Sequence, residues 1–217
     1  MKNTLAKFAL IAGLVGCGPL AQDRPIVRLG TTAAALVTPQ VDSATAEPAA
    51  ELTRAAIEAA PGNLLRISLI AAGATDLVGE NGRNGTKVTW LSREGFGFTF
   101  DGGLLVATRK TGSDLIGADV TGAKRSLANG GNHMRILDFL DGLDQIQQVV
   151  VQCQTVITGQ DTLTIFERTY QTSILEETCE GEGQEFKNTY WRDNNGVIWQ
   201  SRQWISPQAG YLGYQRL

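Results

Sequence analysis

Apolar and polar residues alternate with a period of two along most of the chain after residue 64. Leu65, Ile67 and Leu69 alternate with Arg66 and Ser68, which is the pattern of a β-strand with one buried face. Further strand-like runs, most of them bounded by turn sequences rich in Gly, Asn and Asp, cover residues 86–93, 96–100, 104–108, 146–157, 162–169, 172–179, 185–192, 197–206 and 211–216. This pattern predicts about eight to ten strands in an antiparallel barrel or sandwich.

A helical period occurs clearly once, before the first strand. Leu52, Ala55, Ala56 and Ala59 lie at helical spacing after a polar start and before Pro61-Gly62, a sequence that ends helices. We therefore expect one helix near residues 46–60. The predicted fold class is all-β, with one short N-terminal helix.

The first 16 residues form a targeting segment. Lys2 and Lys7 precede an apolar run over residues 8–15, and this run is shorter than the roughly 20 residues that a spanning helix needs. The sequence Leu14-Val-Gly-Cys17 resembles the bacterial lipobox, which implies cleavage before Cys17 and its lipidation. The alternative is an ordinary signal peptide followed by an incidental Cys.

Residues 17–45 are rich in Ala, Thr, Pro and Gly and predict a tether, so residues 46–217 remain as a single β-rich periplasmic domain. Acyl chains such as palmitate on the N-terminus would hold the protein on a membrane. Gly18 follows the Cys where lipoproteins kept in the inner membrane often carry Asp, and that resemblance implies the periplasmic face of the outer membrane. The net charge of −3, without a basic cluster, argues against a nucleic-acid partner.

Cys153 and Cys179 remain once Cys17 is assigned to lipidation. In an oxidising compartment a disulfide between them is the expected state. A zinc site is disfavoured because neither Cys belongs to a C-x-x-C pair and His133 is the only histidine. A catalytic thiol would lack an evident base unless His133 reached it.

The sequence marks no catalytic residues, cofactor or metal site. Residues 79–85 (GENGRNG) are glycine-rich but lack the Lys-Ser/Thr ending of a phosphate loop, so we interpret them as a hairpin loop. Glycoside hydrolysis needs two facing carboxylates, and no pair stands out among 22 acidic residues.

Two stretches carry candidate binding residues. Arg109 and Asp114 follow a hydrophobic strand, and Arg202 and Trp204 are two residues apart, so that they share one face of a strand while Trp199 lies on the other. Arg beside aromatic side chains suits recognition of a sugar or of a partner protein. The structural alternative is that each Arg stacks on Trp and pairs with Asp, with Arg202 paired to Asp114 as one case.

The sequence resembles the YjbF/GfcB family of capsule and exopolysaccharide lipoproteins. The resemblance spans most of the mature chain and rests on five segments: 103–109 (GLLVATR), 112–115 (GSDL), 186–191 (FKNTYW), 196–204 (GVIWQSRQW) and 207–212 (PQAGYL). Lys110 stands where the family pattern has Gly. The resemblance implies a barrel-like periplasmic lipoprotein that acts in polysaccharide secretion beside an outer-membrane β-barrel protein, with no established catalytic residues.

The expected function is therefore non-enzymatic assistance in the assembly or export of a surface polysaccharide, through binding of glycan or of an export partner. A lipid or lipoprotein carrier would need a deep apolar cavity instead. A polysaccharide-modifying enzyme would need a cleft with convergent carboxylates.

Overall fold

The computed structural model describes residues 52–140 and 143–217. The predicted signal peptide, Cys17, the tether and the first part of the predicted helix lie outside these residues. Within them, no helix is both long enough and apolar enough to cross a membrane.

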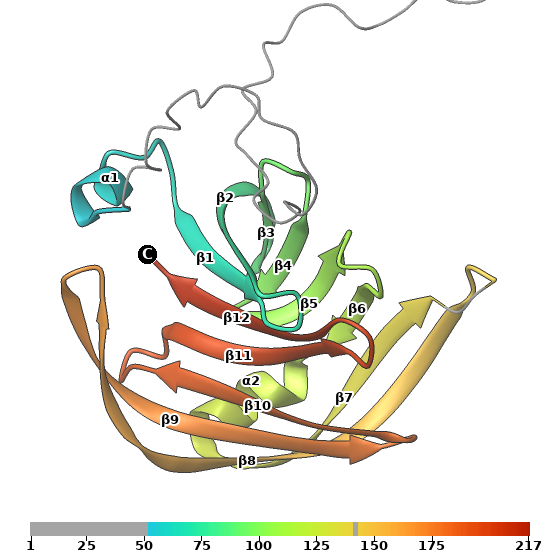
Figure 1. Ribbon diagram of the computed structural model, residues 1–217. Helices are drawn as coiled ribbons and strands as arrows, with labels where there is room; N and C mark the ends of the chain where they lie inside the picture. The colour runs from blue at the N-terminus through green and yellow to red at the C-terminus, as the bar shows by residue number, and fades with distance from the viewer. Residues whose placement is uncertain (1–51, 141–142) are drawn as a thin grey trace, which may run out of the picture. The chain divides into compact units, whose positions relative to one another are not determined.

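Twelve antiparallel strands form one sheet that curls into a nearly closed barrel (Figure 1). The order around the barrel is β5-β4-β3-β2-β1-β12-β11-β10-β9-β8-β7-β6. The strands are β1 (Leu64–Leu69), β2 (Ala74–Asn84), β3 (Lys87–Leu91), β4 (Gly97–Asp101), β5 (Leu104–Arg109), β6 (Leu115–Asp119), β7 (Gly131–Leu140), β8 (Ile146–Ile165), β9 (Arg168–Gly181), β10 (Gln184–Arg192), β11 (Ile198–Ser206) and β12 (Gly210–Arg216).

Side chains join the two edge strands, β5 and β6, where the barrel would otherwise stay open. The Thr108 hydroxyl accepts a hydrogen bond from the Leu115 N–H at 3.0 Å, and it donates to the Asp114 carboxylate at 2.9 Å. The Arg109 guanidinium also donates to the Leu115 carbonyl at 3.4 Å. These contacts satisfy part of the unpaired backbone that an open sheet edge would expose.

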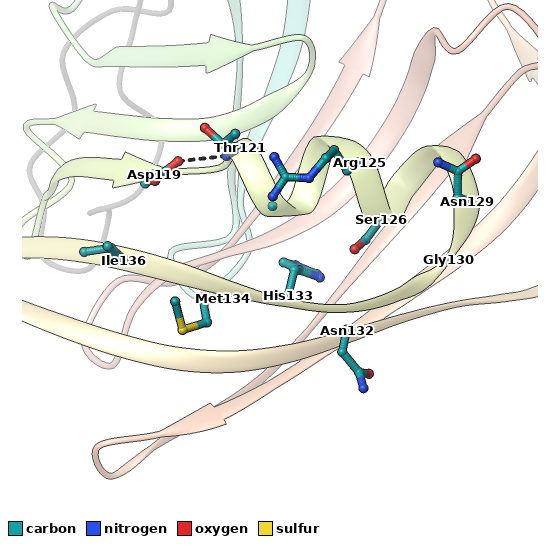
Figure 2. Close-up of a pocket in the computed structure, with 11 residues that line it drawn as sticks. Asp119, Thr121, Arg125, Ser126, Asn129, Gly130, Asn132, His133, Met134 and Ile136 are labelled. Atoms are coloured by element: carbon teal, nitrogen blue, oxygen red, sulfur yellow. Dashed lines mark hydrogen bonds between the residues drawn. The ribbon is translucent and has the colours of Figure 1, made fainter.

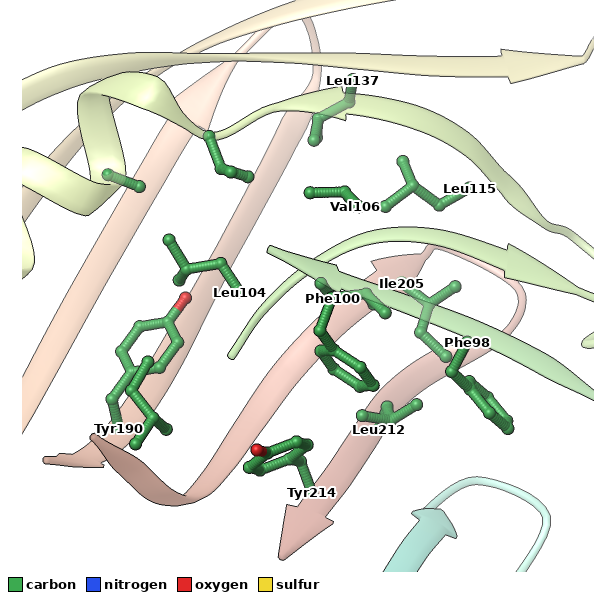
Figure 3. Close-up of a cluster of buried hydrophobic side chains, with 14 of the residues drawn as sticks. Phe98, Phe100, Leu104, Val106, Leu115, Leu137, Tyr190, Ile205, Leu212 and Tyr214 are labelled. Carbon is green, nitrogen blue, oxygen red and sulfur yellow. The ribbon is translucent and has the colours of Figure 1, made fainter. Parts of the chain in front are cut away.

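Alternating apolar side chains from the strands fill the barrel with one continuous core. Figure 3 shows part of it, where Phe98 and Phe100 of β4 lie near Leu212 and Tyr214 of β12. Phe100 and Tyr214 are in ring contact, with centroids 4.9 Å apart. The strands therefore take their inward and outward faces from the two-residue period of the sequence.

A second helix, α2 (Thr121–Asn129), is bound to strands from different parts of the barrel wall. Lys124 forms an ion pair with Asp101 of β4, and Arg192 of β10 donates to the Leu127 carbonyl. Ala123 and Leu127 are buried in the same core as the strands. The buried face of α2 is therefore part of the barrel core.

The all-β fold class predicted from the sequence is confirmed, and so are the predicted strands that correspond to β1, β3–β5 and β10–β12. The predicted loop at residues 158–161 is wrong: β8 continues through it, and the chain turns at Phe166-Glu167, both in the left-handed region at φ 44° and 70°. The loop assigned to residues 79–85 is wrong as well, because β2 runs to Asn84 with a bulge between Glu80 and Gly82. Glycine weakens strand signals, but a bulge tolerates it.

Three further elements, β6, β7 and α2, were not predicted. β6 is only five residues long, and β7 and α2 contain many polar residues that interrupt their apolar pattern. The expected N-terminal helix is present as α1 (Arg54–Glu58), which is shorter within the described residues than the predicted 46–60 and begins after the N-cap Thr53.

Candidate functional site

A cluster of charged and polar side chains lies on the buried face of β7, β9 and β10. It consists of Glu177 from β9, His133 and Arg135 from β7, and Asn188 and Tyr190 from β10, and we call it the Glu177 cluster. The Glu177 Oε1 accepts hydrogen bonds from His133 Nε2 at 2.7 Å and Arg135 Nε at 2.8 Å. Its Oε2 accepts from Arg135 Nη2 at 2.9 Å, and from the Tyr190 hydroxyl and Asn188 Nδ2 at 2.8 Å each.

The electrostatics of the cluster make Glu177 a permanent anion at neutral pH. Its complete burial would by itself raise the pKa of the carboxyl, but the Arg135 charge and the donated hydrogen bonds outweigh burial, and the pKa lies well below its usual range. Burial raises the pKa of Tyr190, so its hydroxyl stays protonated and donates a hydrogen bond to Glu177. A carboxylate that accepts five hydrogen bonds has no free lone pair for acid–base catalysis. The cluster therefore has a structural role, in which it links β7, β9 and β10.

The predicted disulfide between Cys153 of β8 and Cys179 of β9 is confirmed, and it lies beside this cluster. The two residues are direct partners in the antiparallel ladder, and His133 is the ladder partner of Cys153 on β7. Ligand atoms of His133, Cys153 and Glu177 lie within 4.8 Å of one another. In this arrangement the Cys153 sulfur is bonded to Cys179 and the Glu177 oxygens accept protein hydrogen bonds, so the three do not form a ready metal site.

A polar groove opens on the other side of His133, between α2 and the free edge of β7 (Figure 2). β6 pairs with β7 from Ile136 to Phe139, and the chain then leaves the sheet as α2, so α2 instead of a strand faces the first part of β7. The α2–β7 groove has a volume of about 440 Å³. It is lined by Asp119, Thr121, Gly122, Arg125, Ser126, Asn129, Gly130, Asn132, His133, Met134 and Ile136.

Glycine allows the helix to approach β7 closely at the floor of the groove. A Cβ atom at Gly122 would lie 2.9 Å from the His133 Cβ and 3.0 Å from the Met134 carbonyl oxygen. Since real side chains do not reach such distances, Gly122 fixes the depth of the α2–β7 groove.

Several polar side chains of the groove have no partner within the described part of the chain. Arg125, Asn129 and Asn132 are exposed, and none of their side chains makes a hydrogen bond or an ion pair there. The His133 side chain is 3% exposed, and its Nδ1 is buried without a partner among the described residues. The α2–β7 groove thus offers a guanidinium and two amides that have no partner among the described residues.

Of the predicted binding residues Arg109 and Asp114, Arg109 ends β5 and Asp114 lies in the turn between β5 and β6. Asp114 accepts hydrogen bonds from the N–H groups of Lys110 and Thr111 at 2.8 and 2.9 Å and from the Thr111 hydroxyl at 2.6 Å. Partial burial acts to raise its pKa, but the bonds from Thr111, Thr108 and Lys110 outweigh it and lower the pKa. Asp114 therefore organises its own turn.

Lys110, at the position where the sequence resemblance implied Gly, lies in this turn with φ 71°. This is the left-handed region, which glycine occupies without steric cost. The Lys110 side chain donates to the Glu94 carbonyl at 2.7 Å, so the substitution adds a contact to the β3–β4 turn.

Arg202 and Trp204, the other predicted binding pair, lie near each other on β11 but have separate partners. The Arg202 guanidinium is exposed and stacks on Tyr211 at 3.3 Å from the ring centroid. Trp204 is half-buried and stacks on Phe186 with centroids 4.4 Å apart. The suggested pairing of Arg202 with Asp114 is not present, because Asp114 is held within its own turn.

The residues of the Glu177 cluster and of the α2–β7 groove were not singled out from the sequence. A signal for the cluster exists: Glu177 stands between Leu175 and Cys179 in a strand of period two, so it had to face the core and needed a buried partner. The groove depends on the position of α2 beside β7, and no local pattern predicts that position.

Comparison with known proteins identifies the relatives of the chain. The family model described as group 4 capsule polysaccharide lipoprotein GfcB, YjbF matches residues 30–217. The crystal structure of the hypothetical lipoprotein YmcC from Escherichia coli (K12) resembles the chain with a TM-score of 0.65 and 20% identity, over 74% of this chain and 86% of that one. No curated protein sequence matches the chain.

Proposed function

Because the chain belongs to the family of group 4 capsule polysaccharide lipoproteins, we propose that it assists the assembly or export of a capsule or exopolysaccharide without catalysing a reaction. It does so as a lipoprotein anchored through acylated Cys17 at the periplasmic face of the outer membrane. Its contacts are with the glycan itself, with an outer-membrane β-barrel export protein, or with both.

The filled barrel is the observation that supports a surface-binding role. α2, the apolar core and the Glu177 cluster occupy the interior, and α2 is tied to β4 and β10 by charged side chains. A lipid or lipoprotein carrier instead needs a deep apolar cavity for its cargo. A ligand of this barrel therefore binds at its surface.

The distribution of carboxylates speaks against the enzymatic alternative. Glycosidases place two carboxyl groups on opposite sides of the scissile bond, about 5–10 Å apart. Among the described residues that line the α2–β7 groove, Asp119 is the one carboxylate, and Glu177 behind it is fully hydrogen-bonded. The groove is thus equipped to hold a sugar but offers no carboxyl pair to cleave it.

The test is a deletion in the source bacterium, complemented with the wild-type chain or with Cys17→Ser. We expect the deletion to lower the amount of surface polysaccharide, and the wild-type chain to restore it. Cys17→Ser should appear in the soluble fraction and fail to restore export, because the acyl chains are lost. Normal surface polysaccharide in the deletion strain would refute the proposed function.

Crosslinking in intact envelopes then identifies what the chain contacts. Co-purification of an outer-membrane β-barrel protein from cells with the wild-type chain, and its loss with Cys17→Ser, would support an export partner. The Arg93→Gln variant is the matched control, because it changes one exposed residue and keeps the lipid anchor.

A further inference from the structure

We propose that the α2–β7 groove is a binding site for an acidic saccharide unit, such as a hexuronate within a polysaccharide chain. This inference rests on the proposed function and names the chemistry of its ligand.

Charge is the first argument. Arg125 is exposed on α2 without an ion-pair partner among the described residues, and Figure 2 shows its guanidinium extending along the helix above β7. A guanidinium presents donors in a planar fork that matches a carboxylate. The second charge of the groove, Asp119, already accepts the Thr121 N–H at 2.8 Å. Arg125 is therefore the position for the acid group of a ligand.

Hydrogen bonding is the second argument. Asn129 and Asn132 contribute amides that both donate and accept, as sugar hydroxyls do. The Nε2 of His133 faces the ionised Glu177 carboxylate at 2.7 Å, so in the neutral ring Nε2 carries the proton. Its Nδ1 is then an acceptor without a donor among the described residues, and it is buried out of reach of a ligand in the open groove. The polar contacts offered to a ligand are therefore those of Arg125, Asn129 and Asn132.

Asp119 carries the second charge among the described residues that line the groove. Bonds donated by Thr121, with a smaller contribution from the Arg125 charge, lower the pKa of Asp119. The carboxylate is therefore ionised at neutral pH and accepts hydroxyl donors but repels anions. A ligand with several hydroxyl groups and a single acid group suits a site with one guanidinium and one carboxylate, whereas Asp119 would repel a polyphosphate.

Shape is the third argument. A volume of about 440 Å³ is at the small end of ligand sites and suits roughly one or two sugar units. Met134, 53% exposed, and Ile136 form an apolar wall opposite the polar helix. Sugars have hydroxyl edges and apolar C–H faces, and this groove provides a surface for each.

The experiment is a ligand-observed NMR titration of the full-length chain purified from membranes. The acidic probes are trigalacturonate and a hyaluronan tetrasaccharide, and the neutral probe is maltotriose. We expect an acidic probe to bind at least about tenfold more tightly than maltotriose, because the Arg125–carboxylate bond is charge-assisted. Comparable affinity for acidic and neutral probes, or no binding of either acidic probe, would overturn the inference.

The variants test the role of Arg125. Arg125→Gln should lower the affinity for the acidic probe at least about tenfold, and Arg125→Lys should recover part of it by restoring the charge. Arg93→Gln is the matched control, since Arg93 is also exposed but lies in the β3–β4 turn outside the groove. Equal effects of Arg125→Gln and Arg93→Gln would refute a specific site.

The binding experiment and the deletion experiment test the groove assignment and the proposed function independently. If the deletion abolishes export but Arg125→Gln binds and exports normally, the groove assignment is wrong and the proposed function stands. If the deletion leaves export intact while the groove binds acidic saccharides, the proposed function is wrong and the binding site stands.

Discussion

The Glu177 cluster and the α2–β7 groove contain the same kinds of side chain, but those of the cluster are buried and hydrogen-bonded, whereas Arg125 of the groove is exposed and has no partner among the described residues. In the cluster, Arg135 is buried and donates to Glu177 and to Tyr190. In the groove, Arg125 is exposed and makes no hydrogen bond within the described residues. His133 belongs to both regions, because its Nε2 completes the cluster and the residue also lines the groove.

The difference separates stability from recognition. A buried charge with all its hydrogen bonds made helps to hold the β-strands together. Removal of one residue of the cluster leaves its charged or polar partners buried without a hydrogen-bond partner. An exposed charge without partners contributes little to folding, which leaves Arg125 free to bind a ligand without loss of stability. Amino-acid type alone does not separate these roles; burial and partners do.

Glu177→Gln should have the largest effect, because it leaves the Arg135 charge buried without its counterion. We expect a loss of roughly 3–5 kcal/mol in the free energy of unfolding, measured by urea denaturation. Glu176→Gln is the control: Glu176 is on the same strand but forms a partly exposed pair with Lys187, and it should cost less than about 1 kcal/mol. Equal losses in the two variants would contradict a structural role for the cluster.

Acid should reproduce part of this effect. The folded-state pKa of Glu177 lies well below the ordinary value of about 4.3 for the unfolded chain, so its stabilisation is present above that value and is lost as the pH falls toward the folded-state pKa. The wild-type melting temperature should therefore drop below about pH 4.5 more steeply than that of Glu177→Gln. Parallel pH profiles of the two proteins would show that another group controls acid unfolding.

Removal of the disulfide should have the next largest effect. The Cys153→Ala/Cys179→Ala variant loses a cross-link over 26 residues, which corresponds to roughly 2–4 kcal/mol. Urea denaturation of the oxidised protein and the variant measures the loss. Protection of both thiols from alkylation until the protein is reduced is the accompanying check, and free labelling of native protein would refute the bridge in solution.

Arg202→Ala should have a small effect on stability. The variant distinguishes a role of Arg202 in recognition from a structural role. Its guanidinium is exposed on the Tyr211 ring, and such cation–π contacts contribute about 0.5–1 kcal/mol. A melting temperature lowered by only a few degrees is expected. If export nevertheless falls in this variant, Arg202 has a role in recognition; a collapsed melting temperature would identify it as a structural residue.

Arg125→Gln should have the smallest effect on stability, within about 0.5 kcal/mol of wild type. Arg135→Gln is the direct comparison, since it removes the same charge from the buried cluster and should cost several times more. A loss of more than about 2 kcal/mol for Arg125→Gln would mean that Arg125 supports the fold, and the contrast between the two regions would disappear.

Sequence reasoning succeeded where the information is local. The strand β4 follows from Phe98 and Phe100 alternating with smaller residues, and the turn before β5 follows from Asp101-Gly102-Gly103, whose two glycines have φ 64° and 92°. It failed at β2 and β7, where glycine and polar residues interrupt the alternation. Pairing with neighbouring strands stabilises those segments, and this contribution is absent from their local sequence.

The sequence by itself determined that the described chain is an all-β domain with a Cys153–Cys179 bridge, because the two-residue period and the cysteine count are properties of the chain. Only the tertiary structure decided that the sheet closes, that α2 faces the free edge of β7, and that Glu177 meets its partners. His133 and Glu177 are 44 residues apart, and Arg135 and Tyr190 are 55 apart. Contacts at such separations depend on strand order and register, which no single segment specifies.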